Sequence, residues 1–420
     1  MKRTAPDRSA YQPKPVERVE LDGKNIKART ILVVLAVVIA VIAFASAIGG
    51  AMKVDHGWRE IEADAAAGMN CSQDFQFQYY LGGSGVNAAA ELKAITNLYT
   101  QATQMAYHAF DAHALGGETN NLFYLNRNVN TPVQVDPVLY QAFETVERLG
   151  SRYVFMAPAF AEYHSLFSCS EDWETEGFDP YQNEDIRAYV AQVAAFARNP
   201  EDIRIELMGN NTLQLTVSGA YLAFIEENGI GNVVDFYWMR DAFIIDYLAQ
   251  VMEDNGYNRG AISSYNGFVR CLSADVLGYS YHLYDLLEQS TVYKAARLNY
   301  AGGTSLVHLH SFPLNKQKEI YFYQFDDGTV RTPHVDMADG LSKAALPSLI
   351  GTARGGSCAE MLLKLLPLYA ADALDASGLH GLTEQGIYPV YCVDKRIMTT
   401  GDDVTLDEVF EGYQVVAPAK

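Results

Sequence analysis

The sequence predicts an α+β fold: a single domain with mixed or antiparallel sheets and packed helices, preceded by one transmembrane helix. Segments with strand-like alternation and segments with helical spacing follow one another irregularly along the chain, without an internal repeat. Of the 420 residues, 49% are hydrophobic, so the chain can bury a sizeable core. One uncharged apolar run near the N-terminus is long enough to cross a bilayer as a helix.

This apolar run spans residues 31–52, and we expect a transmembrane helix over residues 30–52. In residues 1–29, basic side chains outnumber acidic ones by two to one, which predicts a cytoplasmic tail and an extracytoplasmic remainder. A cleaved signal peptide is the alternative, because Ala45 to Ala47 resembles a cleavage site. The charged leader is long for a signal peptide, so an uncleaved single-pass anchor in the cell membrane is favoured.

After this span, residues 53–73 are predicted to form a short stalk with helical character, and residues 74–415 the extracytoplasmic domain. Residues 74–82 alternate as in a strand, and residues 87–110 have the apolar spacing of a helix. Residues 131–150 predict a turn and then an amphipathic helix that ends at Gly150.

The middle of the chain begins with an acidic, turn-rich segment, residues 170–185. Its continuation predicts a helix over residues 185–197 and short strands at 203–207 and 212–217. A strand-to-helix transition follows near residue 235, and the helix has an apolar face and ends at Gly256.

The last third of the sequence is predicted to form mainly strands. Residues 259–274 have the pattern of a hairpin with Asn266 and Gly267 at its turn. Further strands are predicted at residues 304–312, 318–330 and 387–394, with one helix from about Ala359 to Leu368.

The formal net charge is −20, and because the N-terminal tail is basic, the acidic excess lies in the remainder. Such a surface repels polyanions, so DNA and RNA are not expected as partners. The five cysteines are widely scattered, with no C-x-x-C pair and no zinc-type spacing. Outside the membrane, this number allows one or two disulfides and leaves at least one thiol.

Residues 304–312 place His308 and His310 on the same side of a predicted strand, a spacing that metal sites use. The sequence does not identify a third ligand, so ordinary strand-face histidines are the favoured alternative. The Walker, Rossmann, H-E-x-x-H and G-x-S-x-G signatures are absent.

The segment DFYWMRDAFIID, residues 235–246, holds three aspartates among aromatic and aliphatic residues. The spacing does not bring Asp235, Asp241 and Asp246 together on one helix face, so a three-carboxylate metal cluster is not predicted.

Five segments follow one another in the order of a known set of motifs: NLFYLNRN, TPVQVDPVLYQAFETVERLG, VVDFYWMRDAFIID with its continuation, FDDGTVRTPHVDMADG and CAEMLLKLL. This order resembles the ApbE flavin transferase family over about residues 74–415. The resemblance implies an FAD:protein FMN transferase-like domain, which takes FAD and, with Mg²⁺, attaches FMN to a Ser or Thr of a protein acceptor. It implies a membrane redox protein or a subunit of a redox complex as the partner.

The family pattern at residues 235–246 is Asp-Leu-Gly-Gly-x-Ala-Lys-Gly-Tyr-x-x-Asp. Asp235 and Asp246 match its two ends, whereas Tyr237 and Trp238 replace the glycines and Asp241 stands at the Lys position. A carboxylate in place of a cation beside a pyrophosphate turns attraction into repulsion. Two aromatic side chains fill space that the glycines leave open for the ligand.

By residue-by-residue correspondence, the resemblance implies cofactor contacts at Asp235, Asp241 and Val335, and a metal contact from the backbone of Trp238. His334 matches the histidine to which the family assigns proton abstraction from the acceptor hydroxyl. Catalysis by His334 and hydrogen bonding of His334 within its loop are both open interpretations.

Two positions near residue 360 correspond to the family's Asp and Thr that supply metal oxygens. Glu360 keeps a carboxylate for Mg²⁺, but Lys364 places an ammonium where a hydroxyl ligand is needed. The simplest interpretation is a salt bridge between Glu360 and Lys364 at helical i,i+4 spacing. An alignment shifted by two residues places Cys358 and Leu362 there, and the metal site is lost as well.

Three functions remain open from the sequence. The first is an active FMN transferase that works through His334 and Glu360. The second is a pseudoenzyme, a divergent or inactive member kept as a binding or scaffold module. The third is a structural or adhesive surface protein with only the fold in common. Loss of the Lys, the glycines and the metal hydroxyl together favours the second.

Overall fold

The computed structural model describes residues 56–64, 74–82, 87–274, 277–287, 291–315, 318–401 and 404–416. The chain divides into two units, Met1–Val54 and Asp55–Lys420, and every described residue belongs to the second. The expected cytoplasmic tail and transmembrane helix lie outside the described residues. Within the described ranges, no helix combines the length and the apolar character needed to cross a membrane.

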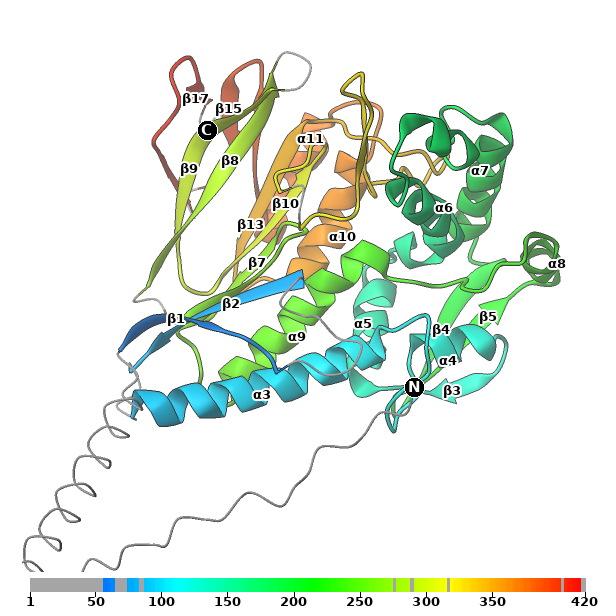
Figure 1. Ribbon diagram of the computed structural model, residues 1–420, viewed down its shortest axis with the longest axis horizontal. Coiled ribbons are helices and arrows are strands. Elements are labelled where there is room, and N and C mark those ends of the chain that lie inside the picture. Colours follow the sequence, from blue (N-terminus) through cyan, green and yellow to red (C-terminus); the bar gives the residue numbers. More distant parts are fainter. Residues whose placement is uncertain are drawn as a thin grey trace, which may run out of the picture. The chain divides into compact units, whose positions relative to one another are not determined.

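The main sheet has nine strands (Figure 1). In spatial order they are β1 (Gly57–Ile61), β2 (Phe75–Leu81), β6 (Gly260–Ser264), β7 (Phe268–Cys271), β10 (Thr304–His310), β13 (Ser348–Arg354), β14 (Tyr388–Val393), β15 (Arg396–Thr399) and β17 (Gln414–Val416). Neighbouring strands run antiparallel, except that β17 is parallel to β15. The predicted α+β class with mixed sheets is therefore confirmed.

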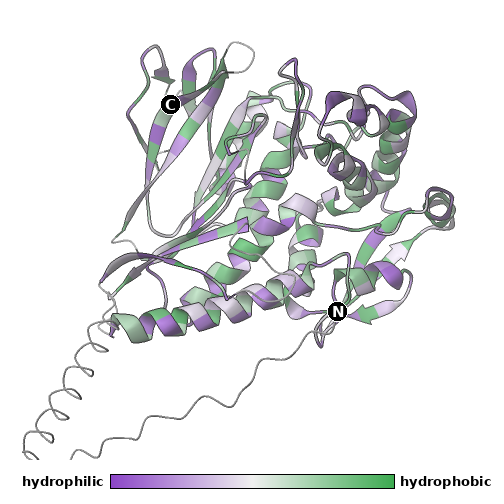
Figure 2. Cartoon of the chain, viewed as in Figure 1, coloured by the Kyte–Doolittle hydropathy of each residue, from purple (hydrophilic) through white to green (hydrophobic). Residues whose placement is uncertain are grey.

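Helices cover one face of this sheet. Helices α9 (Arg240–Asp254) and α10 (Cys358–Tyr369) contact each other and the central strands, and α3 (Ala88–Ala109) packs against α9. Figure 2 shows hydrophobic and hydrophilic residues alternating along α3, as expected of a helix with one face on the core. The helix α5 (Pro137–Arg148) packs against α3 in turn.

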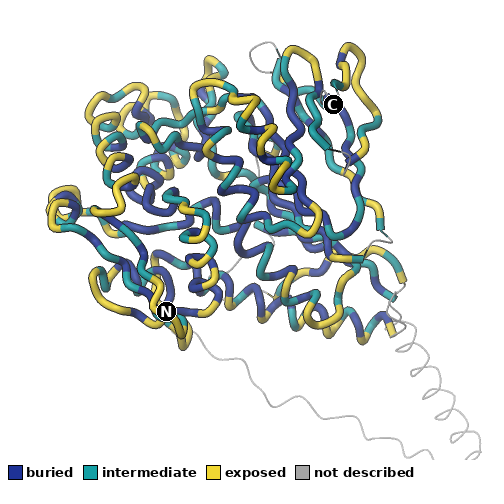
Figure 3. The backbone as a smooth tube through the Cα atoms, turned by 180° about the vertical axis from the view of Figure 1, so that it is seen from behind, coloured by how far each residue is buried: buried dark blue, intermediate teal, exposed yellow. Residues whose placement is uncertain are grey.

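The opposite face is covered by a second, three-stranded sheet in the order β16 (Thr405–Asp407), β9 (Thr291–Ala301) and β8 (Gly278–Leu287). Leu283 and Leu298 of this sheet share a hydrophobic core with Leu306 and Ile350 of the main sheet. The molecule thus has a helical layer and two sheet layers, with buried residues concentrated where the layers meet (Figure 3).

A mainly helical part is inserted between α3 and α9. It holds α4 (Leu122–Arg127), α6 (Ala157–Phe167), α7 (Glu184–Arg198), α8 (Gly219–Asn228), the short 3₁₀ helices η1 (Tyr153–Met156) and η2 (Asp172–Gly177), and a small sheet of β3 (Pro132–Gln134), β5 (Thr212–Val217) and β4 (Ile203–Gly209). The remaining elements are η3 (Tyr237–Met239), β11 (Tyr323–Gln324), β12 (Val330–Arg331), α11 (Ala376–Gly381) and η5 (Leu382–Gln385).

Three expectations from the sequence are wrong in detail. Gly57–Ile61, within the predicted stalk, is not helical but is strand β1, paired with β2. The predicted strand at residues 318–330 contributes only the two-residue strand β11 and the start of β12. The segment before Asp235 is not a strand of any sheet.

The cysteines do not form the disulfides that the sequence allowed among the described residues. Cys169, Cys271, Cys358 and Cys392 are free thiols, and the fifth cysteine, Cys71, lies outside the described ranges.

Candidate functional site

The segment that leads into Asp235 is fixed by a buried amide. Asn126 of α4 accepts hydrogen bonds at Oδ1 from the backbone N–H groups of Val233 (2.9 Å) and Val234 (3.0 Å). Its Nδ2 donates to the carbonyl oxygen of Val234 (2.9 Å). The side chain therefore satisfies backbone groups that a neighbouring strand would otherwise pair, and it holds this segment in place.

The turn at Asp235 has a glycine-like backbone. Asp235 Oδ1 accepts a hydrogen bond from the N–H of Tyr237 (2.8 Å), and Tyr237 has a φ of +49°. Residues other than glycine rarely adopt this left-handed region. The Tyr237 ring is held by stacking on Phe160 (ring centroids 5.3 Å apart) and by edge contact with Tyr321 (4.8 Å). Tyr237 thus keeps a conformation suited to glycine while adding a large side chain.

Trp238 fills the space behind this turn. The side chain is 2% exposed, lies parallel to Phe268 (centroids 6.0 Å apart) and meets the His334 ring edge-on (4.9 Å). The second aromatic residue of the turn therefore contacts the histidine that the sequence singled out.

His334 is a buried, neutral imidazole. Its Nδ1 lies 3.1 Å from Thr332 Oγ1, and a second ring, Tyr369, packs against it (centroids 5.0 Å apart). Burial, with a smaller contribution from His310, lowers the pKa of His334 to about 3. A base with so low a pKa takes up a proton poorly near neutral pH.

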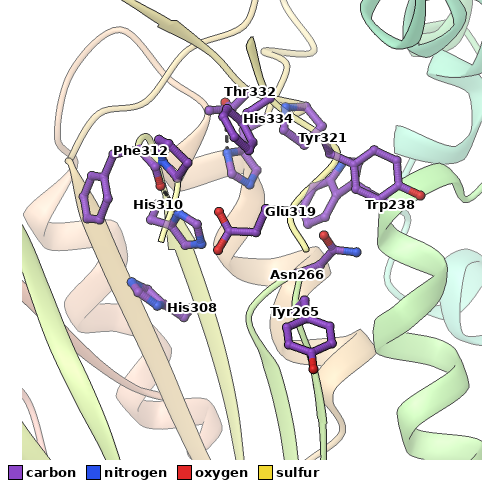
Figure 4. A pocket seen from close by; sticks show the side chains of 13 residues that line it. Trp238, Tyr265, Asn266, His308, His310, Phe312, Glu319, Tyr321, Thr332 and His334 are labelled. Atoms are coloured by element: carbon purple, nitrogen blue, oxygen red, sulfur yellow. Dashed lines mark hydrogen bonds between the residues drawn. The ribbon is translucent and has the colours of Figure 1, made fainter. Parts of the chain in front are cut away.

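The space in front of His334 is a cavity of about 40 Å³ (Figure 4). Its lining includes Trp238, Asn266, His308, His310 and Glu319. Since one water molecule needs roughly 10–15 Å³ by this measure, the cavity holds a few waters and no flavin.

The two strand-face histidines in this cavity are bonded to the protein. His308 Nε2 lies 2.8 Å from Ser348 Oγ, and its Nδ1 lies 3.2 Å from the Tyr281 hydroxyl. His310 Nδ1 lies 2.5 Å from the carbonyl oxygen of Phe312. In the part of the chain that the structure describes, no three His, Cys, Asp or Glu side chains are arranged to hold a metal ion. These contacts favour ordinary strand-face histidines.

Asp241, at the position of the family's lysine, connects α9 to the β6–β7 hairpin. Its Oδ2 accepts hydrogen bonds from Ser264 Oγ (2.5 Å) and Asn266 Nδ2 (2.7 Å). The carboxyl group is buried, and burial raises its pKa to about 6, although Arg240 opposes this shift. Its contacts with Ser264, Asn266 and Arg240 make the residue a structural link.

The positively charged side chain at this turn is Arg240, which directly precedes Asp241 and matches no functional position of the motif. Its guanidinium lies 3.6 Å from Asp74, 3.8 Å from Asp241 and over the ring of Tyr107. Consecutive residues of a helix point in directions about 100° apart. Arg240 therefore faces a second, larger cavity.

That cavity has a volume of about 590 Å³ and lies on the other side of η3. Asp235, Tyr237, Arg240 and Tyr321 line one part of it, and α6 lines another. Its size falls within the range of roughly 300–1,000 Å³ that is usual for small-molecule sites. The spacing of the motif predicts the turn at Asp235. The wall formed by α6 was not predicted, because α6 is distant from this turn in the sequence.

The remaining residues predicted for the site are structural. Asp246 accepts hydrogen bonds from Ser357 Oγ (2.6 Å) and from the N–H groups of Cys358 and Ala359 (both 2.9 Å), at the N-terminus of α10. Val335 is fully buried and forms a β-bridge with Ser342. The ion pair of Glu360 is with Arg148 of α5, instead of the expected Lys364.

Comparison with solved structures identifies the fold. An ApbE protein from Thermotoga maritima superimposes with a TM-score of 0.53 at 11% identity, covering 85% of this chain and 99% of that one. The chain has an ApbE-like fold.

Two further structures give lower TM-scores. They are a flavin transferase ApbE from Vibrio cholerae (0.48, 13% identity, 79% and 92% covered) and a flavinyl transferase ApbE from Pseudomonas stutzeri (0.46, 8%, 84% and 94%). No family model and no curated protein matches the sequence. The superposition on the Thermotoga maritima protein shows a shared fold at 11% identity, and activity has to be argued from the site.

Proposed function

We propose that this chain is a divergent member of the flavin transferase fold that binds a ligand but does not transfer FMN. The observation that carries this proposal is Asp241. A carboxylate stands at the lysine position, and Ser264 and Asn266 hold it in place by hydrogen bonds. A pyrophosphate brought to this point meets a negative charge in a site of low dielectric, where repulsion is strong.

The surroundings of His334 support the same proposal. Trp238 packs edge-on against the imidazole, and the free volume in front of it is about 40 Å³. An acceptor hydroxyl needs to approach a catalytic base within hydrogen-bond distance. With Trp238 in this position, the hydroxyl of a protein acceptor has no room to do so.

The residues present also do not fit the family's metal. Glu360 is paired with Arg148, and the position of the hydroxyl ligand is Lys364, whose ammonium cannot coordinate a cation. We therefore assign no reaction step to FAD or Mg²⁺ in this chain.

The proposed setting is the cell membrane, with residues 30–52 as an uncleaved anchor, the N-terminal tail in the cytoplasm and the ApbE-like domain outside. In that setting the partner would be a protein of a membrane redox complex. The anchor and the basic tail of the sequence support this placement.

A transfer assay tests the proposal. Full-length protein is incubated with FAD, Mg²⁺ and an acceptor protein that carries an Asp-x-x-x-Ala-Thr motif, and the acceptor is examined for flavin fluorescence in a denaturing gel. We expect no fluorescent acceptor, whereas an active flavin transferase in the same assay labels it. Covalent labelling of the acceptor by this chain overturns the proposal.

A back-substituted variant separates the effect of the changed charges from the effect of Trp238. Asp241→Lys combined with Lys364→Thr restores the family's charges but leaves Trp238 in place. We expect this variant to remain inactive. Transfer by the variant would show that charge alone prevents the reaction and that Trp238 is no barrier.

A further inference from the structure

The 590 Å³ cavity combines flat apolar walls with groups that can bond a ligand. Tyr237 and Tyr321, which are partly buried, supply aromatic surface, and the buried Phe160 stacks on Tyr237. Pro158 and Ala161 of α6 add apolar surface to the lining. Aromatic walls favour a planar ring, because both stacked and edge-to-face contacts are available to it.

One carboxylate in the lining lacks a partner. Glu162 is partly buried and, within the described part of the chain, forms neither a hydrogen bond nor an ion pair. Burial raises its pKa, which is the direction expected for a carboxyl group with no donor nearby. A polar group withdrawn from water in this way gains from a ligand that donates a hydrogen bond to it.

The charge of the cavity is unfavourable for phosphate. Asp111, Glu162 and Asp235 are in the lining, against one permanent cation among the lining residues, Arg240. That cation already faces Asp74 at 3.6 Å and Asp241 at 3.8 Å. The local balance is negative, so a dianionic group is repelled whereas an uncharged ring is not.

We propose that this cavity binds an uncharged, planar nitrogen heterocycle that donates a hydrogen bond, and that it discriminates against the phosphorylated form of the same ring. The inference deepens the proposed function, because it names the ligand class of a protein that does not transfer a nucleotide. It is tested by a binding measurement, whereas the proposed function is tested by covalent transfer, so either can fail without the other.

Riboflavin and FMN are suitable probes, since they share one ring system and differ by a phosphate. Full-length protein is titrated into each, and binding is followed by the quenching of flavin fluorescence and by equilibrium dialysis. We expect saturable binding of riboflavin and at least tenfold weaker binding of FMN. Absence of riboflavin binding, or FMN binding as tight as riboflavin, overturns the proposal.

Two variants locate the site. Ala161→Trp adds a large ring to an exposed position of α6 in the cavity lining, and we expect it to weaken riboflavin binding at least tenfold. Ala188→Trp is the matched control, because Ala188 is equally exposed on the neighbouring helix α7 but is not in the lining. It should bind within twofold of the unmodified protein. Riboflavin binding that survives Ala161→Trp overturns the assignment.

The role of charge is tested by Glu162→Gln, which keeps the shape of the side chain. We expect the ratio of the FMN to the riboflavin dissociation constant to fall about threefold or more. A ratio that does not change would show that this carboxylate does not set the discrimination.

Discussion

At the scale of single residues, the turn that begins at Asp235 combines a glycine-like backbone with a large aromatic side chain. Tyr237 has a positive φ although it is not glycine, and its ring is fixed by Phe160 and Tyr321. Such a conformation costs about 1–3 kcal/mol, which the surrounding contacts must offset. A tyrosine at residue 237 therefore adds an aromatic ring to the cavity lining, and its backbone conformation is strained.

This strain predicts an unusual order of stabilities at residue 237. Tyr237→Ala and Tyr237→Gly both lose the ring contacts, but only glycine adopts the left-handed region freely. We expect Tyr237→Gly to be more stable than Tyr237→Ala by about 1 kcal/mol, measured by urea unfolding. At most non-glycine positions alanine is the more stable of the two, so an alanine variant as stable as the glycine variant contradicts the strain.

Asp241 predicts a dependence of stability on pH. Its pKa is about 6 in the folded protein against 3.8 unfolded, so the folded state binds the proton more tightly. The stabilisation from this group is complete below the unfolded pKa and is lost as pH rises through about 6. Between pH 4 and pH 7 we expect the protein to lose up to about 3 kcal/mol relative to Asp241→Asn. Paired unfolding curves measure this, and a constant difference between the two proteins rules out the shifted pKa.

At the scale of elements, α9 and α10 are joined by the carboxylate of Asp246. It accepts three hydrogen bonds at the N-terminus of α10, where the helix dipole also favours a negative charge. The far end of the motif thus has a structural role that its spacing alone did not reveal.

The contrast between Asp246 of α9 and Glu360 of α10 can be measured, because both make contacts near the N-terminus of α10. Asp246→Ala leaves two backbone N–H groups and a hydroxyl unpaired, and we expect a loss of about 2–4 kcal/mol in the free energy of unfolding. Glu360→Ala removes an exposed ion pair with Arg148 and should cost less than about 1 kcal/mol. Adding Mg²⁺ or EDTA should leave the melting temperature unchanged, whereas a Mg²⁺-dependent rise that Glu360→Ala abolishes would indicate a metal site there.

Most of the elements that the sequence predicted well have one face on the core. Helices α3, α5, α7, α9 and α10 and strands β2, β4, β5, β6, β7, β10 and β14 all occur where periodicity placed them, within a few residues. Strand β13 was missed because its residues are buried on both faces, so no alternation marks it, and because Gly351 interrupts it, whereas the similarly buried β10 contains no glycine. Residues 318–330 were assigned wrongly because Glu319 accepts hydrogen bonds from the N–H groups of Leu314 and Asn315, which favours a turn.

At the scale of the whole molecule, the order of the motifs predicted the fold but not the location of the larger cavity. Of the residues predicted for the site, Trp238 and His334 meet beside η3, whereas Glu360 pairs with Arg148 of α5. The α6 wall of that cavity belongs to a helical insertion that no motif marks. Which residues face each other across a cavity depends on tertiary packing, and one sequence does not contain that information in its local pattern.

The proposed anchor, residues 30–52, would determine which compartment the ApbE-like domain meets. An uncharged run of this length is predicted to stay in the bilayer, with the basic tail held in the cytoplasm by the positive-inside bias. We expect the full-length chain to remain in the membrane after alkaline washing. Protease added outside intact cells should remove the domain but not an N-terminal tag, and a chain that begins at Asp55 should leave the membrane fraction. Release of an intact domain from the full-length chain would instead indicate cleavage near Ala47, and a tag digested in intact cells would reverse the orientation.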